Sequence, residues 1–162
     1  MSQLPASAPA SARDAFAHIN AVTAPTLDDL KLMVFLEASA LNSYFDLART
    51  APAPQIATLL EANGREELAH AHRVSQVIKL VSGEDFPPPA ASDNPYVTPS
   101  DRALDAGILG YLVGSERNGA TLYEAWASHM TNPEAAALLR LNGKEEIDHA
   151  NRAAEALALM PA

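Results

Sequence analysis

The sequence predicts an all-α protein, a bundle of four helices that form two antiparallel hairpins joined by a long crossover. Apolar residues make up 48% of the 162 residues and only seven residues are Gly, a composition typical of a helical domain. Four segments repeat apolar residues at helical spacing. The links within each pair of segments are short and the link between the pairs is long. This favours two hairpins over an up-and-down bundle with three short loops.

The N-terminal segment, residues 1–25, is rich in Ala, Ser and Pro, without the basic start or the continuous apolar stretch of a secretory signal. We expect residues 1–25 to form a flexible tail and residues 26–162 to form one domain, since this length supports a single core. No run of about twenty apolar residues is present, so we expect a cytoplasmic protein without a membrane span.

Local signals mark the first hairpin. A helix is predicted after Thr26, because Asp28 and Asp29 fall in its first turn, where acidic side chains are favourable. A second helix is predicted from Pro54, since proline fits the first helical position. Residues 83–99 contain five prolines and cannot continue that helix. This stretch is long enough to cross the bundle.

Similar signals mark the second hairpin. Its first helix is predicted to begin with Thr98 or Ser100 as the N-cap. Its second helix is predicted to begin at Asn132 and Pro133, a cap followed by proline at the first helical position, and to run to about Met160.

The composition also limits the chemistry. The absence of cysteine excludes disulfides, iron–sulfur ligation and rubredoxin-type iron within this chain. Any metal must therefore be held by oxygen and imidazole donors. The formal charge of −9 opposes non-specific attraction to nucleic acid, so a nucleic-acid partner is not expected.

The two predicted hairpins repeat each other in sequence. Residues 60–71, LEANGREELAHA, align with residues 139–150, LRLNGKEEIDHA. Two further pairs align in the same register, Glu37 with Glu116 and Tyr44 with Tyr123. Both copies contain Asn-Gly, ordinarily a turn signal. Because the apolar period continues through it, we place Gly64 and Gly143 inside helices, where either close helix approach or a local bulge next to the ligands would explain them.

Four glutamates continue the apolar stripes of their helices: Glu37, Glu67, Glu116 and Glu146. An unpaired ionised carboxylate inside a bundle is strongly unfavourable, so each needs a proton, a cation or a metal. Glu37 and Glu67 lie equally far along the chain from Pro52, one before it and one after it, so an antiparallel hairpin brings them to one level. The other two are placed in the same way about Thr131. All four carboxylates are therefore expected in one layer.

A histidine accompanies the glutamate of the second and fourth helices. His70 stands three residues after Glu67, and His149 three after Glu146, which places each pair on one helix face. Two divalent ions offset four carboxylate charges, and oxygen with imidazole donors suits iron or manganese better than zinc. We predict a centre of two iron ions, with manganese as the alternative. Its predicted ligands are Glu37, Glu67, His70, Glu116, Glu146 and His149.

One Glu on each of two helices, with Glu-x-x-His on the other two, resembles the di-iron carboxylate proteins of the ferritin-like superfamily. This group includes rubrerythrins, bacterioferritins and quinone-precursor hydroxylases, and the resemblance covers residues 26–160. It implies a ferritin-like four-helix bundle in which Glu67 and Glu146 bridge two metals. It also implies that Glu66 and Glu145, each just before a ligand, orient an imidazole from outside the ligand set.

The resemblance assigns Glu37 and His70 to one metal, and Glu116 and His149 to the other. Two tyrosines, Tyr44 and Tyr123, lie two turns beyond the lone glutamate of their helices. They are placed to hydrogen-bond a ligand or relay an electron, although core packing is the commoner role of a buried tyrosine.

Departures from the family pattern narrow what the resemblance implies. Rubrerythrins carry an extra Glu three residues after the third-helix ligand; Gly119 stands here, which argues against their route of peroxide reduction and leaves room for a substrate. Leu68 replaces the haem-binding Met of bacterioferritins, so no haem is expected. Storage cages of the family use a fifth, C-terminal helix, and the sequence ends after the fourth, so no such cage is expected.

We predict an oxidoreductase that activates O2 or peroxide at its two metals. Electrons are expected from an external donor, since the chain has no cysteine-held cluster or dinucleotide fingerprint. Two alternatives stay open: a ferroxidase that handles iron, and a non-catalytic metal-binding bundle. Family habit implies a homodimer. Gly107, Gly110 and Gly114 share a face of the third helix that is either a dimer surface or the seat of the crossover.

Overall fold

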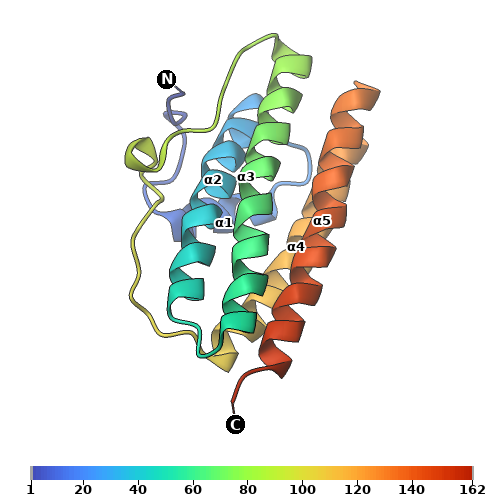
Figure 1. Cartoon of the computed structure of the whole chain (residues 1–162). Coiled ribbons are helices and arrows are strands. Elements are labelled where there is room, and N and C mark those ends of the chain that lie inside the picture. The colour runs from blue at the N-terminus through green and yellow to red at the C-terminus, as the bar shows by residue number, and fades with distance from the viewer. Residues whose placement is uncertain (1, 162) are drawn as a thin grey trace.

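The computed structural model describes residues 2–161, and in this range the protein is helical, with no strand. A short helix precedes four long ones, which form a bundle and confirm the predicted helical class (Figure 1). The elements are α1 (Ala12–Ala21), α2 (Leu27–Arg49), α3 (Pro54–Ser82), the 3-10 helix η1 (Ala91–Asp93), α4 (Ala106–His129) and α5 (Pro133–Ala158). None of these described helices combines the length and apolarity needed to cross a membrane.

Three of the four long helices begin where the sequence predicts. Thr26 and Asp29 form a capping box at the start of α2. The Asn132 side chain accepts hydrogen bonds from the first backbone N–H groups of α5. Pro54 occupies the first turn of α3, and this helix stops at Gly83, whose φ of 77° lies in the left-handed region. Short links then let α2 pack along α3, and α4 along α5.

The start of α4 differs from the prediction. Its N-cap is Asp105, and neither Thr98 nor Ser100 begins the helix. The backbone N–H of Ser100 donates to Asp46 at 2.8 Å, and its carbonyl accepts from Arg49 at 3.0 Å. The end of α2 thus satisfies backbone groups that a helix would otherwise satisfy, so the chain stays extended here.

The link between the hairpins runs along the outer side of α2 (Figure 1). Asn94 Nδ2 donates to the carbonyl of Phe35 in α2 at 2.7 Å. The glycine face of α4 is left uncovered by the described residues, because a Cβ on Gly110 or Gly114 would meet no neighbouring atom within 4 Å. The reading of this face as the seat of the crossover is therefore wrong. The homodimer surface stays a prediction.

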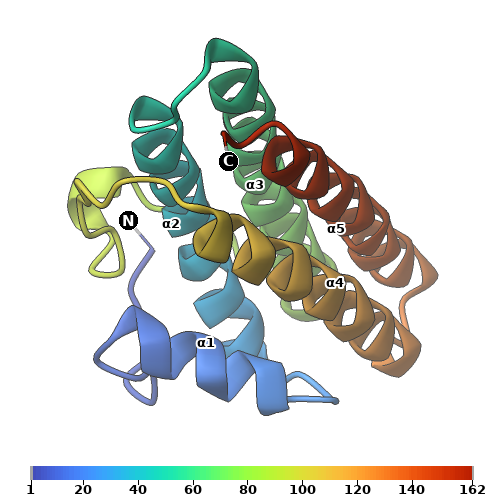
Figure 2. The ribbon, with the colours of Figure 1, turned by 90° about the horizontal axis from the view of Figure 1, so that it is seen from below.

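The N-terminal segment contains structure that its composition does not predict. Within the expected flexible tail, α1 lies across the side of the bundle formed by α2 and α4 (Figure 2). Ala15 and Ile19 are buried in the core. The Trp126 indole N–H donates at 2.8 Å to the carbonyl of Val22, just after α1. Two apolar residues four apart give even this short helix a face to bury.

The two hairpins pack closely through α3 and α5 and are spread apart between α2 and α4. α3 and α5 contact each other, whereas no Cα of α2 lies within 8 Å of a Cα of α4, two helices that are described in full. Within the hairpins, a Cβ on Gly64 would lie 3.0 Å from Tyr44 Cβ, and one on Gly143 would lie 3.1 Å from Tyr123 Cβ. The predicted close helix approach at both glycines is confirmed.

Candidate metal centre

Six buried side chains from four helices meet in one layer of the bundle. They are the predicted ligands: Glu37 from α2, Glu67 and His70 from α3, Glu116 from α4, and Glu146 and His149 from α5. None is more than 8% exposed. Their oxygen and nitrogen atoms form two overlapping groups of four residues, each with all ligand atoms within 4.8 Å of one another, and Glu67 forms a third such group with the two histidines. Both groups of four contain Glu67 and Glu146; one adds Glu37 and His70, the other Glu116 and His149.

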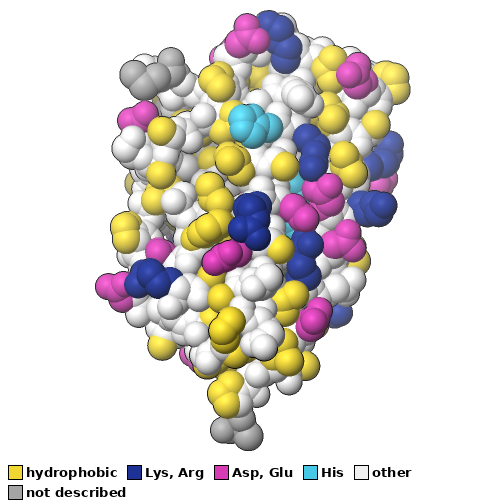
Figure 3. All heavy atoms as spheres, in the orientation of Figure 1, with side chains coloured by type: hydrophobic (Ala, Val, Ile, Leu, Met, Phe, Trp, Pro, Cys, Tyr) yellow, Lys and Arg dark blue, Asp and Glu magenta, His cyan; other side chains and the backbone are white. Residues whose placement is uncertain are grey.

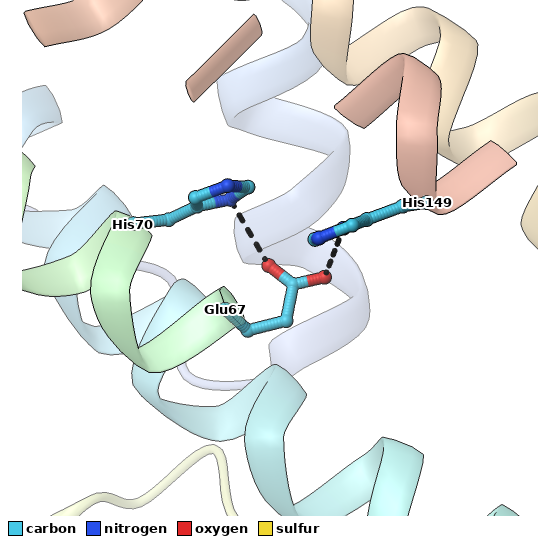
Figure 4. Close-up of side chains that lie close together, drawn as sticks. All are labelled: Glu67, His70 and His149. Atoms are coloured by element: carbon cyan, nitrogen blue, oxygen red, sulfur yellow. Dashed lines mark ion pairs between the residues drawn. The ribbon is translucent and has the colours of Figure 1, made fainter. Parts of the chain in front are cut away.

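Two of the four carboxylates face both imidazoles. The two oxygens of Glu67 lie 3.4 Å from His70 Nδ1 and 3.3 Å from His149 Nδ1 (Figure 4). The two oxygens of Glu146 lie 3.3 and 3.6 Å from the same nitrogens. A carboxylate whose oxygens point to two different partners has the geometry of a bridge between two cations.

Each of the other two carboxylates approaches one imidazole: Glu37 lies 3.9 Å from His70, and Glu116 lies 3.6 Å from His149. Each also accepts a hydrogen bond from a buried tyrosine of the facing helix. Tyr123 in α4 donates to Glu37 in α2, and Tyr44 in α2 donates to Glu116 in α4. These bonds connect the two helices that are otherwise spread apart.

Both imidazoles are oriented by a carboxylate of the other hairpin. His70 Nε2 lies 3.1 Å from Glu145, and His149 Nε2 lies 3.0 Å from Glu66. A carboxylate at Nε2 favours the tautomer with its proton there, so the Nδ1 lone pair faces the four glutamates. The two rings are stacked, with centroids 5.0 Å apart. Both glutamates predicted to orient an imidazole thus lie next to one.

The inward nitrogens, Nδ1 of His70 and of His149, are buried and have no hydrogen-bond partner among the described residues. Carboxylate oxygens lie as close as 3.3 Å, but no hydrogen bond of normal geometry joins them. Buried polar atoms in proteins are nearly always satisfied. Two inward lone pairs beside four carboxylates are the donor set that two cations would satisfy.

Two arginines that the sequence predictions do not include hold the outer carboxylates in place. Arg73 donates to Glu145 at 2.8 Å and to the Asn142 side chain at 2.6 Å. The Asn142 amide in turn donates to the carbonyl of His70 at 3.3 Å. The second copy of the repeat has the same contacts: Arg152 donates to Glu66 and to the Asn63 side chain, and the Asn63 amide donates to the carbonyl of His149. The sequence signal for the arginines is the repeat itself, since the same alignment also relates Arg73 to Arg152.

These ion pairs cover the imidazole side of the centre. Arg73 and Glu66 belong to α3, and their partners Glu145 and Arg152 belong to α5, so both pairs cross between these helices. Figure 3 shows basic and acidic side chains interspersed over this face of the molecule. The imidazoles beneath them are fully buried.

The carboxylates compete for protons. Burial raises the pKa of Glu37 well above its usual range, and the nearby charges of Glu67 and Glu146 add to this effect. Burial also raises the pKa of Glu146. Burial alone would raise the pKa of Glu67 too, but the two imidazoles outweigh it and lower that pKa. Burial would lower the pKa of His149, yet the surrounding carboxylates raise it to about 11. Cations that replaced these protons would relieve the competition.

The carboxylate side of the centre opens into a cavity of about 240 Å³ between α2 and α4. All four glutamates line this cavity, as do Tyr44 and Tyr123, whereas neither imidazole does. The centre therefore has one closed side, with imidazoles and ion pairs, and one accessible side. An accessible side is what distinguishes a reactive metal site from a purely structural one.

In comparisons with known proteins, no family model, curated protein or solved structure matches this chain. The assignment of a function therefore depends on the residues and geometry of the centre.

Proposed function

We propose that this chain is a ferritin-like, dinuclear iron carboxylate protein, and that it acts as an oxidoreductase on O2 or peroxide. The observation that carries the proposal is the pair of buried, unpartnered Nδ1 atoms of His70 and His149, which face a layer of four glutamates. Without a cation, neither nitrogen has a hydrogen-bond partner of normal geometry among the described residues. Two bound cations satisfy them and offset the carboxylate charge.

The donor set supports two metals rather than one. Glu67 and Glu146 belong to both groups of converging atoms and would bridge. Each group adds one imidazole and one unshared carboxylate, so the two positions are equivalent. Carboxylate oxygens with imidazole nitrogens, and no thiolate, favour iron, with manganese as the alternative. Two hairpins, the crossover along α2 and inward Glu-x-x-His pairs support the ferritin-like arrangement.

When bound, the two metals would supply the redox chemistry that O2 or peroxide requires. The residues of the chain position the metal-binding side chains and control access to them. Glu66 and Glu145 hold the imidazoles in the tautomer that presents Nδ1 inward. Tyr44 and Tyr123 fix the orientation of the unshared carboxylates. The α3–α5 ion pairs shield one side from water, so reactants approach only from the cavity side. Electrons would come from a separate donor.

A ferroxidase that handles iron is the second candidate, and the same cavity supports it. All four carboxylates line the cavity, so Fe(II) can reach the centre from that side. The glutamates at the inner end of the cavity would attract such a cation. The two functions differ in the fate of the metal, which stays in an oxidoreductase and passes on in an iron-handling protein.

Metal analysis of protein purified from iron-supplied cells tests the proposal. We expect about two irons per chain, and a reduced, anaerobic sample should consume O2 with a change in absorbance. His149→Ala should lose metal, whereas His72→Ala, on an exposed position of α3, should not. Protein that folds normally but binds no metal would refute the proposal. Retention of zinc without O2 consumption would favour a structural site, and uptake far beyond two irons would favour iron handling.

A further inference from the structure

The cavity beside the metal centre has a mostly apolar lining, in which the polar side chains of its walls and roof include Asn20, Ser43 and Ser115. α1 provides the roof with Phe16 and Ile19, as its position across α2 and α4 shows (Figure 2). Met33 and Leu47 of α2 and Leu112 and Leu122 of α4 provide the walls. The floor is formed by the four glutamates of the centre. Tyr111 also lines the cavity and is 71% exposed, so the cavity reaches solvent on that side.

We propose that this cavity binds a small, uncharged, largely apolar organic molecule of one or two rings, held against the accessible side of the centre. The role of such a molecule as a substrate rests on the proposed function. Its binding does not, because walls and roof are made by the chain alone.

The volume limits the size of the occupant. An apolar cavity of about 150 Å³ is enough to hold benzene, and this cavity measures about 240 Å³. One ring fits with room to spare, and a fused pair of rings fills the space. The lining is mostly apolar, so the gain on binding comes from removing apolar surface from water.

The charges of the lining exclude ionised molecules. Among the described residues no Lys, Arg or His lines the cavity, so in the metal-free protein a buried anion would find no cation to pair with and would face four carboxylates. Once two divalent ions offset those carboxylates, the floor offers no net charge to a cation either. An uncharged molecule avoids the cost of burying an unpaired charge in either state of the centre.

Small residues leave space directly beside the glutamates. Ala40 and Gly119 stand one turn after Glu37 and Glu116, at equivalent positions of the repeat, and both line the cavity. A Cβ on Gly119 would already lie 3.2 Å from Glu146 Cδ. A larger side chain at either position would occupy the space that the proposed ligand needs.

Calorimetric titration with indole tests the proposal on the protein as purified and again after metal removal. We expect saturable binding of one indole per chain in both samples. In the metal-free sample, indole-2-carboxylate, an anion of similar shape, should bind at least about tenfold more weakly. Ala40→Phe fills the cavity and should also weaken indole binding at least about tenfold. Ala137→Phe, at an exposed position of α5, should bind indole like the wild type.

Circular dichroism shows whether each variant folds, and Ser43→Phe, at an exposed position that lines the same cavity, replaces Ala40→Phe if that variant does not. Absence of saturable indole binding, equal binding of the anion to the metal-free protein, or unchanged binding by a folded filled-cavity variant would each overturn the proposal. Iron content measured on the same samples separates the two proposals. If the protein contains iron but does not bind indole, only the proposal of a cavity ligand is refuted. If it binds indole but contains no iron, only the proposed metal function is refuted.

Discussion

Removal of the carboxylate behind an imidazole should weaken metal binding without unfolding the protein. Glu145 accepts from His70 Nε2 at 3.1 Å and from Arg73 at 2.8 Å. In Glu145→Ala the imidazole loses the group that fixes its tautomer and orientation. Loss of such a contact typically lowers metal affinity by about 10–100-fold, or about 1.4–2.7 kcal/mol.

The two halves of the centre allow an internal comparison. The side chain of Glu145 is 23% exposed and that of Glu66 is 36% exposed. Because water screens a more exposed contact, Glu66→Ala should fall at the lower end of that range and Glu145→Ala at the upper end. Glu145→Gln should be intermediate, since an amide oxygen still accepts from His70 but carries no charge for Arg73.

Competition of each variant with a chelator for Mn(II), at fixed pH, measures the affinities. Glu61→Ala is the matched control, since Glu61 lies in the same helix as Glu66 and contacts only Arg65, at 3.4 Å, among the charged side chains described. It should bind metal like the wild type. The reasoning is refuted if folded Glu145→Ala keeps its affinity, or if Glu61→Ala loses as much.

Three further predictions follow from single side chains. Gly143→Ala should lower the free energy of unfolding by about 1–3 kcal/mol in urea titrations, because its Cβ would lie 3.2 Å from a backbone oxygen of α4. In Gly110→Ala the new Cβ meets no neighbouring atom, so this change should raise the free energy of unfolding by up to about 1 kcal/mol. Equal effects of Gly143→Ala and Gly110→Ala on the free energy of unfolding would contradict the packing argument. Gly119→Ala should weaken Mn(II) binding, since its Cβ presses on Glu146; unchanged affinity would contradict this. Asp29→Asn should lower the free energy of unfolding by about 1 kcal/mol near pH 7. Burial acts to raise the pKa of Asp29, but hydrogen bonds from the capping box and from a histidine of α1 lower it. Its contribution is therefore fully present above about pH 4 and is lost progressively at lower pH, and a difference between the proteins that did not shrink as the pH fell below about 4 would oppose that origin.

The sequence predicts the parts of the fold that depend on local signals. Thr26, Pro54 and Asn132 mark helix starts because capping and proline preferences act within one turn. The convergence of Glu37 with Glu67 follows from counting residues on either side of a tight turn, which fixes the register of an antiparallel hairpin. Such features need no knowledge of distant contacts.

Features that depend on distant contacts were not predictable in the same way. Thr98 and Ser100 are good N-caps by residue type. However, side chains at the end of α2 hydrogen-bond to the backbone of Ser100, and α4 begins only after Asp105. α1 is stabilised by burial against other helices, which Ala-rich and Pro-rich composition does not reveal. Arg73 and Arg152 look like ordinary surface charges until the opposite hairpin supplies their partners.

The outer contacts of the centre all cross between the two hairpins. Glu66 contacts the imidazole of the other half, as does Glu145, and each tyrosine bonds to the unshared glutamate of the other half. Neither hairpin alone can therefore orient its own ligands. The centre depends on the α3–α5 packing as much as on the ligands themselves.

The internal repeat is broken where the cavity is closed. Trp126 stands at the position equivalent to Leu47. Its ring packs edge-on against Tyr123, with centroids 6.4 Å apart, and its N–H holds the carbonyl of Val22. Leucine offers no such donor, so this hydrogen bond to the end of α1 has no counterpart at Leu47. Repetition thus accounts for two equivalent sets of donor atoms, and the departure from it adds a hydrogen bond that holds the roof on the α4 side. A symmetric bundle would build the same donor set but would lack this hydrogen bond from α4 to the end of α1.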